Sequence, residues 1–318
     1  MKLNLDKNKK YVVAFSGGSD SVYLTHQLQT QKFDFRLIHV KHPNSKASTS
    51  ANEIEAFCLS FAKEKNIDIT ILDMSLDSEK IKDFGTEAAE RESRYSTILN
   101  SLSSEEILLT GHHLDDQIEN VLFRLFRGTS VNGLRGIMSS NRIIRPLQHV
   151  KKSEITNYLT SVCIIYRYDF TNNNNEMSRN FIRNKIIPLV CEHFGESKVY
   201  SSIKRLIENM RDTSGLLEDL YQIDYQTLEV NASGIDLVSF VNLLDEKRQK
   251  NFLYHYIVST TQKFPTSSVI EECRKRFANY VTSGKKRDIM FIIGGFVSIK
   301  IFSQENNKLL FKVEHAIE

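Results

Sequence analysis

Two short motifs in the chain carry residue types that can do phosphate chemistry. The first follows the apolar run 11–15 and consists of six small or acidic residues: Ser16, Gly17, Gly18, Ser19, Asp20 and Ser21. Small residues between a strand and a helix N-terminus let backbone N–H groups approach an anion closely. No lysine follows the glycines and the spacing is not G-x-G-x-x-G, which excludes a Walker A loop and a dinucleotide loop. We predict a phosphate-binding loop; the alternative is a tight turn capped by Ser19 or Asp20.

The second motif, residues 111–120, places two histidines beside two carboxylates: His112, His113, Asp115 and Asp116. Imidazole is a general base near neutral pH, and carboxylate oxygens are the ligands that Mg²⁺ prefers. The alternative places Asp115 at the N-cap of a helix, with Asp116 and Glu119 stabilised by the helix dipole. That alternative explains the acids but not the paired histidines. We therefore predict an acid–base and metal site here.

Regular elements must bring these two motifs together. Four β-rich runs alternate with helical patterns near 20–30, 51–65 and 87–102; the runs are 11–15, 35–40, 67–73 and 106–110. This order predicts an α/β fold with a doubly wound parallel sheet. Ligands bind such sheets at the carboxyl ends of the strands, where the direction of winding switches. If the fourth strand lies beside the first, Asp20 and Asp115 meet in one crevice.

The pattern changes after residue 197. Long amphipathic helices are predicted at about 197–220, 238–260 and 266–283, followed by three strand-like runs. A length of 318 residues suits two domains. We predict domain boundaries of 1–214 and 215–318, the second domain being mainly helical and of the α+β class.

Composition excludes several classes of protein. With 41% hydrophobic and 25% charged residues, the chain is not disordered, collagen-like or a disulfide scaffold. Its four cysteines form no C-x-x-C pair, which argues against structural zinc and thioredoxin-like chemistry. We find no signal-peptide core or membrane-length apolar run, and so predict a cytoplasmic protein with no membrane partner. A net charge of +3 does not by itself indicate nucleic-acid binding, which depends on clustering of charge.

The first motif resembles the pyrophosphate loop of the PP-loop, or N-type ATP pyrophosphatase, superfamily, whose fold is adenine nucleotide alpha hydrolase-like. Within it, the run HHLDDQIENVLFRLFRGTSVNGLRGI (112–137) resembles the tRNA(Ile)-lysidine synthases. Further matches lie in EAAERESRY, in IIRPLQHVKKSEI and in RNFIR, so that the resemblance covers about 11–195. Asn120 and Ile137 are mild departures from the family pattern. His42 is followed by Pro43 where the family often reads HGLR, so no substrate role is carried over to that loop.

The resemblance implies an ATP-dependent carbon–nitrogen ligase. Such an enzyme adenylates the wobble cytidine in the CAU anticodon of tRNA(Ile), then attaches free L-lysine at C2 to form lysidine, releasing AMP and pyrophosphate. It further implies ATP on the loop 16–21, Mg²⁺ on Asp20 and Asp116, and proton transfer by His113, or His112, with Asp115. The implied substrate-binding residues are Arg127, Arg179, Asn180 and Arg183.

The resemblance also implies that the C-terminal domain binds the tRNA body. Two basic clusters in that domain, 274–276 and 285–287, are candidates for contacts with RNA phosphate. Charge removal at Lys285, Lys286 and Arg287 is expected to weaken tRNA binding and flatten its salt dependence. The sequence leaves a homodimer open, and it does not show which residues select lysine.

Two other functions are kept as alternatives. One is a small-molecule adenylating amide ligase of the PP-loop superfamily, which would release AMP without RNA. The other is an RNA-binding protein on an inactive ATPase fold, which the intact SGGSDS and HHLDD motifs argue against. Release of AMP with and without tRNA distinguishes all three.

Overall fold

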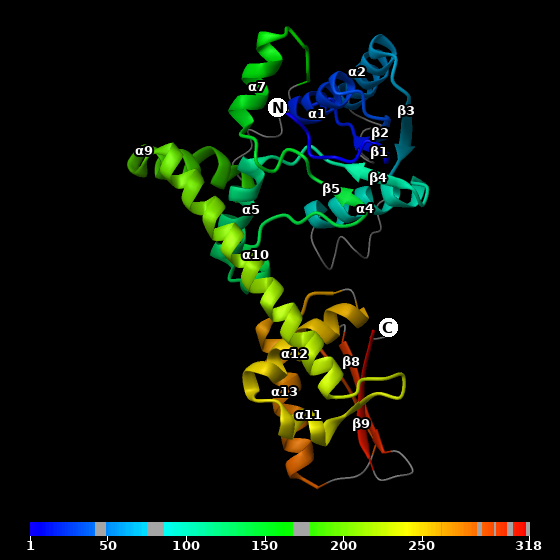
Figure 1. Cartoon of the computed structure of the whole chain (residues 1–318), viewed down its shortest axis with the longest axis vertical. Helices are drawn as coiled ribbons and strands as arrows, with labels where there is room; N and C mark the ends of the chain where they lie inside the picture. Colours follow the sequence, from blue (N-terminus) through cyan, green and yellow to red (C-terminus); the bar gives the residue numbers. More distant parts are fainter. Residues whose placement is uncertain are drawn as a thin grey trace. The chain divides into compact units, whose positions relative to one another are not determined.

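The computed structural model describes residues 1–41, 49–74, 86–167, 178–261, 263–284, 288–295, 297–303 and 308–315 (Figure 1). The chain forms two compact units, one of residues 1–128 and 133–207, the other of residues 129–132 and 208–318. The change from one unit to the other falls within helix α10 (Glu196–Thr227). The predicted domain boundary after residue 214 stays a prediction.

The first unit is built on a five-stranded parallel sheet with the strand order β3-β2-β1-β4-β5. Its strands are β1 (Lys10–Ala14), β2 (Phe35–Lys41), β3 (Ile69–Asp73), β4 (Glu106–Leu109) and β5 (Ile143–Ile144). Strand β1 pairs with β2 on one side and with β4 on the other, so the direction of winding reverses between β1 and β4. This confirms the predicted α/β fold, and the fourth strand lies beside the first, which is the condition under which Asp20 and Asp115 were expected to meet. The loops that follow β1 and β4 therefore leave the same edge of the sheet next to each other.

Strand β1 is buried on both faces, because successive side chains of a strand point to opposite sides. Tyr11 and Val13 belong to one core, which is shared with α1 (Ser19–Thr30), α2 (Thr49–Lys65) and α7 (Lys152–Ser161). Val12 belongs to a second core, which is shared with α4 (Thr86–Ser101). Val12 and Val13 are both 0% exposed, and burying each such side chain contributes roughly 1.5–3 kcal/mol. Helices thus cover both faces of the sheet (Figure 1).

A further group of helices follows β4. These are α5 (Leu114–Arg127), α6 (Val131–Leu134), α8 (Ser178–Phe181), the π-helical segment η3 (Ile182–Ile186) and α9 (Ile187–Phe194). Helix α5 ends before Gly128, which has a φ of +76°. A small core of Leu114, Ile118, Ile182, Ile187 and Tyr200 joins α5 to η3, α9 and the start of α10.

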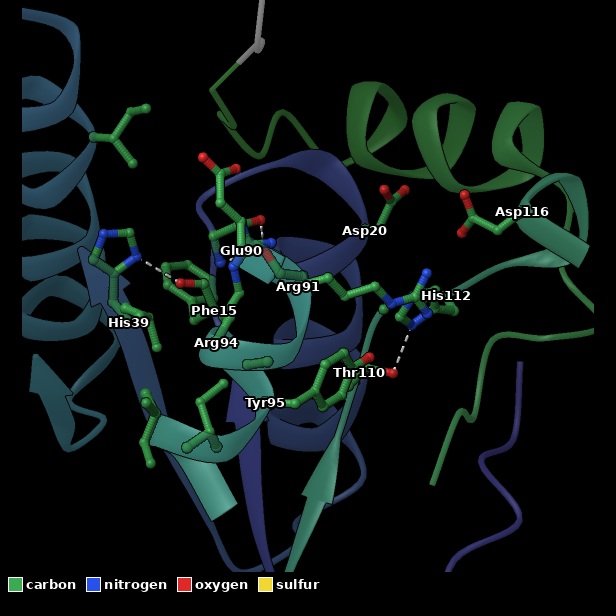
Figure 2. A pocket seen from close by; sticks show the side chains of 18 of the residues that line it. Phe15, Asp20, His39, Glu90, Arg91, Arg94, Tyr95, Thr110, His112 and Asp116 are labelled. Carbon is green, nitrogen blue, oxygen red and sulfur yellow. Dashed lines mark hydrogen bonds between the residues drawn. The ribbon is translucent and has the colours of Figure 1, made fainter. Parts of the chain in front are cut away.

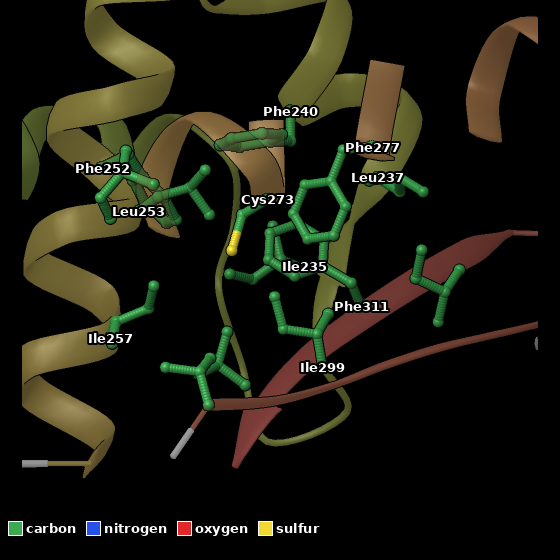
Figure 3. Packing of buried hydrophobic residues seen from close by; sticks show 14 of the residues in the cluster. Ile235, Leu237, Phe240, Phe252, Leu253, Ile257, Cys273, Phe277, Ile299 and Phe311 are labelled. Atoms are coloured by element: carbon green, nitrogen blue, oxygen red, sulfur yellow. The ribbon is translucent and has the colours of Figure 1, made fainter. Parts of the chain in front are cut away.

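The second unit combines helices with an antiparallel sheet of strand order β6-β9-β8-β7. Its elements are β6 (Ile235–Asp236), α11 (Leu237–Leu243), α12 (Glu246–Thr261), α13 (Ser267–Thr282), β7 (Ile289–Ile293), β8 (Val297–Ser303) and β9 (Leu309–His315). Aromatic rings and the Cys273 side chain fill the core between helices and sheet (Figure 3). The rings of Phe277 and Phe311 lie 4.6 Å apart between centroids. This unit has the predicted α+β character.

Some predicted elements differ from the observed ones. A single helix over 238–260 is wrong: the chain forms α11 and α12, because the Asp245 carboxylate accepts the backbone N–H groups of Lys247 and Arg248 at 2.9 and 3.0 Å and so caps a new helix. Strands β5 and β6 were not predicted, since two residues show no periodicity.

The loop at His42 and Pro43 and the basic cluster of Lys285, Lys286 and Arg287 lie outside the described residues. Within the described ranges, every helix is too short or too polar to cross a membrane.

A bidentate ion pair joins β2 to β4 across β1. Arg36 Nε and Nη2 donate to Glu106 Oε1 and Oε2 at 2.7 and 3.0 Å. The two side chains are 25% and 14% exposed. The hydrogen bonds from Arg36 lower the pKa of Glu106 to about 2. The pair therefore helps to fix the order of the three central strands.

We expect Glu106→Gln to lower the free energy of unfolding by about 1–2 kcal/mol at neutral pH, because charge-assisted hydrogen bonds are lost. Since the folded pKa is lowered, this stabilisation is present above the unfolded pKa of about 4.3. It is lost as the pH falls through about 2. In urea unfolding, the difference between the two proteins should shrink from neutral pH to acid pH. Glu105→Gln, at an exposed neighbour, is the control, and an equal loss in that variant would contradict the assignment.

Candidate active site

The loop after β1 has a shape that only glycine allows at its second position. Gly17 has a φ of +77°, and a Cβ atom there would lie 3.0 Å from the Phe57 ring. Its carbonyl accepts the Arg167 backbone N–H at 2.8 Å. Helix α1 begins at Ser19 with Gly18 as its N-cap, so the alternative of a turn capped by Ser19 or Asp20 is wrong. The loop therefore presents backbone at a helix N-terminus, as a phosphate site requires.

The two serines that flank the loop hold it closed. The Ser21 hydroxyl donates to the Gly18 carbonyl at 2.9 Å and lies 3.3 Å from the Ser16 hydroxyl. It also accepts the Ser16 backbone N–H at 3.3 Å. Ser21 is buried whereas Ser16 is exposed. Binding of phosphate by these hydroxyls and by the backbone of Gly17 to Ser19 stays a prediction.

The two motifs meet at the carboxyl ends of β1 and β4, as the strand order predicts. A Cβ atom on Gly111 would lie 3.0 Å from the Asp20 backbone carbon and Cβ, so glycine permits this close approach. His113 is 3% exposed, and its Nε2 lies 3.8 Å from Asp20 Oδ2 and 3.5 Å from Asp116 Oδ2. The structure thus brings together Asp20, His113 and Asp116.

Asp115 lies on the other side of the His113 ring and ties three elements together. One carboxylate oxygen lies 3.5 Å from His113 Nδ1 and accepts the Lys152 backbone N–H at 2.8 Å. The other accepts the Tyr200 hydroxyl at 2.6 Å. Burial alone would raise the pKa of Asp115, but these hydrogen bonds outweigh it and lower the pKa to about 2. Asp115 therefore remains ionised and orients the imidazole.

Asp115 is not the N-cap of α5. That position belongs to His113, whose backbone N–H donates to Asp116 Oδ2 at 2.9 Å. The alternative that made Asp115 the N-cap is therefore wrong, and the first turn of α5 is closed by Asp116 instead. Asp115 is left to contact α7 and α10.

The two histidines have different electrostatic environments. Burial lowers the pKa of His112 to about 4, with Arg145 and Arg91 acting in the same direction, so its ring is neutral. His112 Nδ1 lies 2.8 Å from the Thr110 hydroxyl. Burial also acts to lower the pKa of His113, but Asp115, Asp116 and Asp20 outweigh it and the net pKa is raised. The pKa values of the two imidazoles are therefore shifted in opposite directions.

A cavity of about 530 Å³ opens beside the loop after β1. Side chains of α4 form one wall, and Arg91 extends from there toward His112 (Figure 2). Near the end of β2, His39 Nδ1–H donates to the Phe15 carbonyl at 2.8 Å. The lining includes Ser16, Asp20, Ser21, His39, Arg91, Arg94, Tyr95, His112, Asp116 and Arg179. We call this the loop cavity.

A second cavity of about 340 Å³ lies on the side of His113 that faces Asp115. We call it the acidic cavity, because three carboxylates line it together with two cationic side chains. Its lining is His113, Asp115, Glu119, Lys152, Arg183, Ile187, Pro188, Cys191, Glu196 and Tyr200. Asp20 and Asp116 line the loop cavity, whereas His113, whose Nε2 lies 3.8 and 3.5 Å from them, lines the acidic cavity.

Arg183 is bound to carboxylates of α5. Its Nε and Nη2 donate to Glu119 at 2.5 and 2.9 Å, and Nη2 also lies 3.3 Å from Asp116 Oδ1. Burial raises the pKa of Glu119 and Arg183 opposes it. The guanidinium is carried by η3, and π-helical segments recur at functional sites. A contact of Arg183 with substrate stays a prediction.

The other predicted substrate-binding residues lie further along α5 and α8. The guanidinium carbons of Arg127 and Arg179 lie 5.1 and 5.2 Å from the centre of the Phe123 ring. Arg179 lines the loop cavity, whereas Arg127 is exposed and Asn180 lines neither cavity. Arg179 and Arg183 contact Phe123 and Glu119, which lie one turn apart on α5.

The carboxylates of Asp20 and Asp116 fit the requirements of Mg²⁺. Both approach one side of His113, and both offer the hard oxygen atoms that this ion prefers. Among the described residues, no group of three or more His, Cys, Asp or Glu side chains is arranged to hold a metal. Mg²⁺ commonly takes only one or two protein carboxylates and completes its shell with phosphate and water. The pair therefore suits a metal that arrives with a nucleotide.

The family model that describes the PP-loop domain matches residues 1–190. The chain belongs to the PP-loop family. The match includes the loop after β1, the histidine–aspartate motif, Lys152 and η3, so all of these are parts of a PP-loop domain.

Curated relatives of this PP-loop protein carry the name tRNA(Ile)-lysidine synthase. That of Pseudomonas fluorescens (strain Pf0-1) is 30% identical over 79% of this chain and 58% of its own length. That of Wigglesworthia glossinidia brevipalpis is 31% identical over 76% and 62%. That of Coxiella burnetii (strain RSA 493 / Nine Mile phase I) is 27% identical over 85% and 60%. The chain thus spans about three fifths of the length of these relatives.

Among solved structures, the NMN synthetase of Francisella tularensis aligns with 49% of this chain and 62% of its own, at 12% identity and a TM-score of 0.33. A likeness this weak carries no argument about function.

Sequence reasoning missed several residues of the PP-loop site. Lys152 and Tyr200 lie 132 and 85 residues from Asp20 and Asp115, which they contact, and neither belongs to a motif with that chemistry. Glu119 had a usable signal, since it follows Asp116 by three residues and shares its helix face. Arg91 and Arg94 were seen only as part of a resembling segment, without a role.

We expect the two histidines to titrate far apart in the metal-free protein. The imidazole of His112 should remain neutral until about pH 4. That of His113 should protonate above the ordinary value of about 6.5. NMR titration of the ring Cε1–H signals, assigned with His112→Gln and His113→Gln, measures both. The reverse order of the two pKa values would contradict the electrostatic assignment.

Proposed function

We propose that this PP-loop protein is a tRNA(Ile)-lysidine synthase, an ATP-dependent ligase that adenylates the wobble cytidine of tRNA(Ile) and joins L-lysine to it. The observation that carries the proposal is the meeting of the loop 16–21 with His113 and Asp116 between two cavities. The name carried by the relatives supports the choice of RNA and lysine as substrates. In this proposal the loop cavity binds the nucleotide and the acidic cavity binds the amine.

ATP occupies the loop cavity. Its phosphates lie on the backbone N–H groups of Gly17 to Ser19, where the start of α1 adds a favourable dipole. Arg91 and Arg94 line the same cavity and suit the charged or polar parts of the nucleotide. Mg²⁺ held by Asp20 and Asp116 would offset the phosphate charge.

RNA approaches along α5. Phe123 lies between Arg127 and Arg179, and the rings of Phe126 and Phe181 are 64% and 46% exposed. Guanidinium groups bind RNA phosphate, and exposed aromatic rings stack on unpaired bases. Because Arg179 also lines the loop cavity, this surface leads to the site where the α-phosphate would lie.

The acidic cavity receives the lysine. Carboxylates of Asp115, Glu119 and Glu196 suit an amine, while Arg183 suits the α-carboxylate of a free amino acid. His113 has Asp115 on its Nδ1 side, and in its neutral form the imidazole can take a proton from the attacking amine at Nε2. The amine nitrogen then forms a bond to C2 of the cytosine as the bond from C2 to the AMP oxygen breaks.

The decisive experiment is incubation of the protein with ATP, labelled L-lysine and bulk tRNA. We expect label in RNA only when all three are present, with one AMP and one pyrophosphate released for each lysine joined. AMP released equally well without tRNA would favour the small-molecule amide ligase. No pyrophosphate release under any condition would leave a non-catalytic RNA-binding protein.

In the same assay, Asp20→Asn should abolish pyrophosphate release, because the carboxylate at the start of α1 is lost. Affinity for tRNA should change little. Asp34→Asn, which removes an exposed carboxylate at the start of β2, is the matched control. Unaltered turnover in Asp20→Asn would refute the assignment of the loop.

We expect Arg127→Ala and Arg179→Ala to weaken tRNA binding. Each should reduce the slope of the logarithm of the binding constant against the logarithm of the salt concentration by about one, because one phosphate contact is lost. ATP affinity should be retained in Arg127→Ala, because Arg127 does not line the loop cavity. Filter binding over a series of salt concentrations measures the slope. Arg142→Ala, at an exposed arginine on a different segment, is the control; a matching loss there would show a non-specific effect of charge.

A further inference from the structure

The loop 16–21 contains no basic residue, yet a lysine reaches it from a distant helix. Lys152, the first residue of α7, donates from Nζ to the Ser19 hydroxyl at 2.7 Å and to Asp20 Oδ1 at 2.5 Å. The contact spans more than 130 residues of sequence. The Lys152 ammonium group therefore contacts both Ser19 and Asp20 at the start of α1.

The position of Lys152 is fixed by packing and by a buried carboxylate. Its backbone N–H donates to Asp115 Oδ2 at 2.8 Å. Helix α7 shares the main core with α1 through Ile155 and Leu159, both 0% exposed. Edge contact between the rings of Tyr158 and Tyr23, 5.3 Å apart, adds to this packing. The backbone from which the Lys152 side chain extends is thus held in place beside the loop 16–21.

Stability does not account for a lysine at this place. A cation in the first turn of a helix is opposed by the helix dipole. The ion pair with Asp20 is partly exposed, the side chains being 39% and 30% accessible, and such pairs contribute about 0–1 kcal/mol. Lys152 also lines the acidic cavity, so a ligand in that cavity can reach its side chain. A functional role explains the arrangement better than a structural one.

We propose that Lys152 binds the pyrophosphate leaving group. Helix α7 thereby brings a lysine to the loop 16–21, whose own sequence contains none. This rests on the proposed use of ATP. The cytidine oxygen forms a bond to the α-phosphorus, and the bond from that phosphorus to the bridging oxygen breaks. The electron pair leaves with pyrophosphate, whose growing charge the ammonium stabilises without giving up a proton. When ATP binds, the Lys152 ammonium group leaves the Asp20 carboxylate and contacts phosphate oxygens instead.

Binding of inorganic pyrophosphate, measured by calorimetry at a fixed Mg²⁺ concentration without RNA or lysine, tests this role directly. Lys152→Ala should weaken binding about ten- to hundredfold, because a charge-assisted contact is lost. Lys152→Arg should restore part of the affinity, whereas Lys152→Met, which keeps the stem without the charge, should not. Lys151→Ala is the matched control, since Lys151 pairs with Glu196 and lies over the Tyr200 ring instead of the loop.

Pyrophosphate affinity equal to wild type in both Lys152→Ala and Lys152→Met would overturn the proposal. So would an equal loss in Lys151→Ala, or a change confined to the KM for lysine. If Lys152→Ala folds poorly by thermal melting, the comparison of Arg with Met at this position decides. A wild-type chain that binds pyrophosphate through Lys152 but transfers no lysine to RNA would refute the proposed substrates and leave this role intact.

Discussion

Parallel pairing of β1 with β4 is the constraint on which the rest of the site depends. The pairing runs from Lys10 opposite Glu106 to Val13 opposite Leu109, so the two strands end at the same level. Each strand is followed at once by a loop and a helix, and Gly111 lets the second loop lie against Asp20. A shift in this register would separate the phosphate loop from His113. The ion pair of Arg36 in β2 with Glu106 in β4 passes over β1 and opposes such a shift.

Once the loops meet, charge holds the site together. Four carboxylates, Asp20, Asp115, Asp116 and Glu119, surround three cationic groups, His113, Lys152 and Arg183. A buried charge is costly unless a partner of opposite sign lies close by, so each member depends on its neighbours. The site is therefore organised before any substrate binds, and the energy needed to order it is supplied by folding.

Sequence patterns predicted the parts of this arrangement that are local or topological. The alternation of strands and helices brought Asp20 near the histidine motif on the condition that the fourth strand lay beside the first, and the small residues of 16–21 indicated a phosphate loop. The partners that complete the cluster were not predictable: Lys152 and Arg183 reach their carboxylates across 132 and 64 residues. Lysines and arginines at such separations look like ordinary surface residues, because no periodicity connects them. The N-cap at His113 was missed for a related reason. By residue type, Asp115 is the better capping residue, but its carboxylate accepts hydrogen bonds from residues that are distant in the sequence.

The π-helical segment that carries Arg183 has a consequence for how related chains can vary. A π-helical turn holds more residues than an α-helical turn, and Ile187, just after it, is anchored in a buried core. A chain one residue shorter here would continue as an α-helix, and the preceding residues would rotate by about 100° about the helix axis. Arg183 would then leave Glu119 buried without its partner. Single-residue deletions, which surface loops absorb easily, would here be selected against as strongly as the loss of a catalytic side chain, although the deleted residue need touch no substrate.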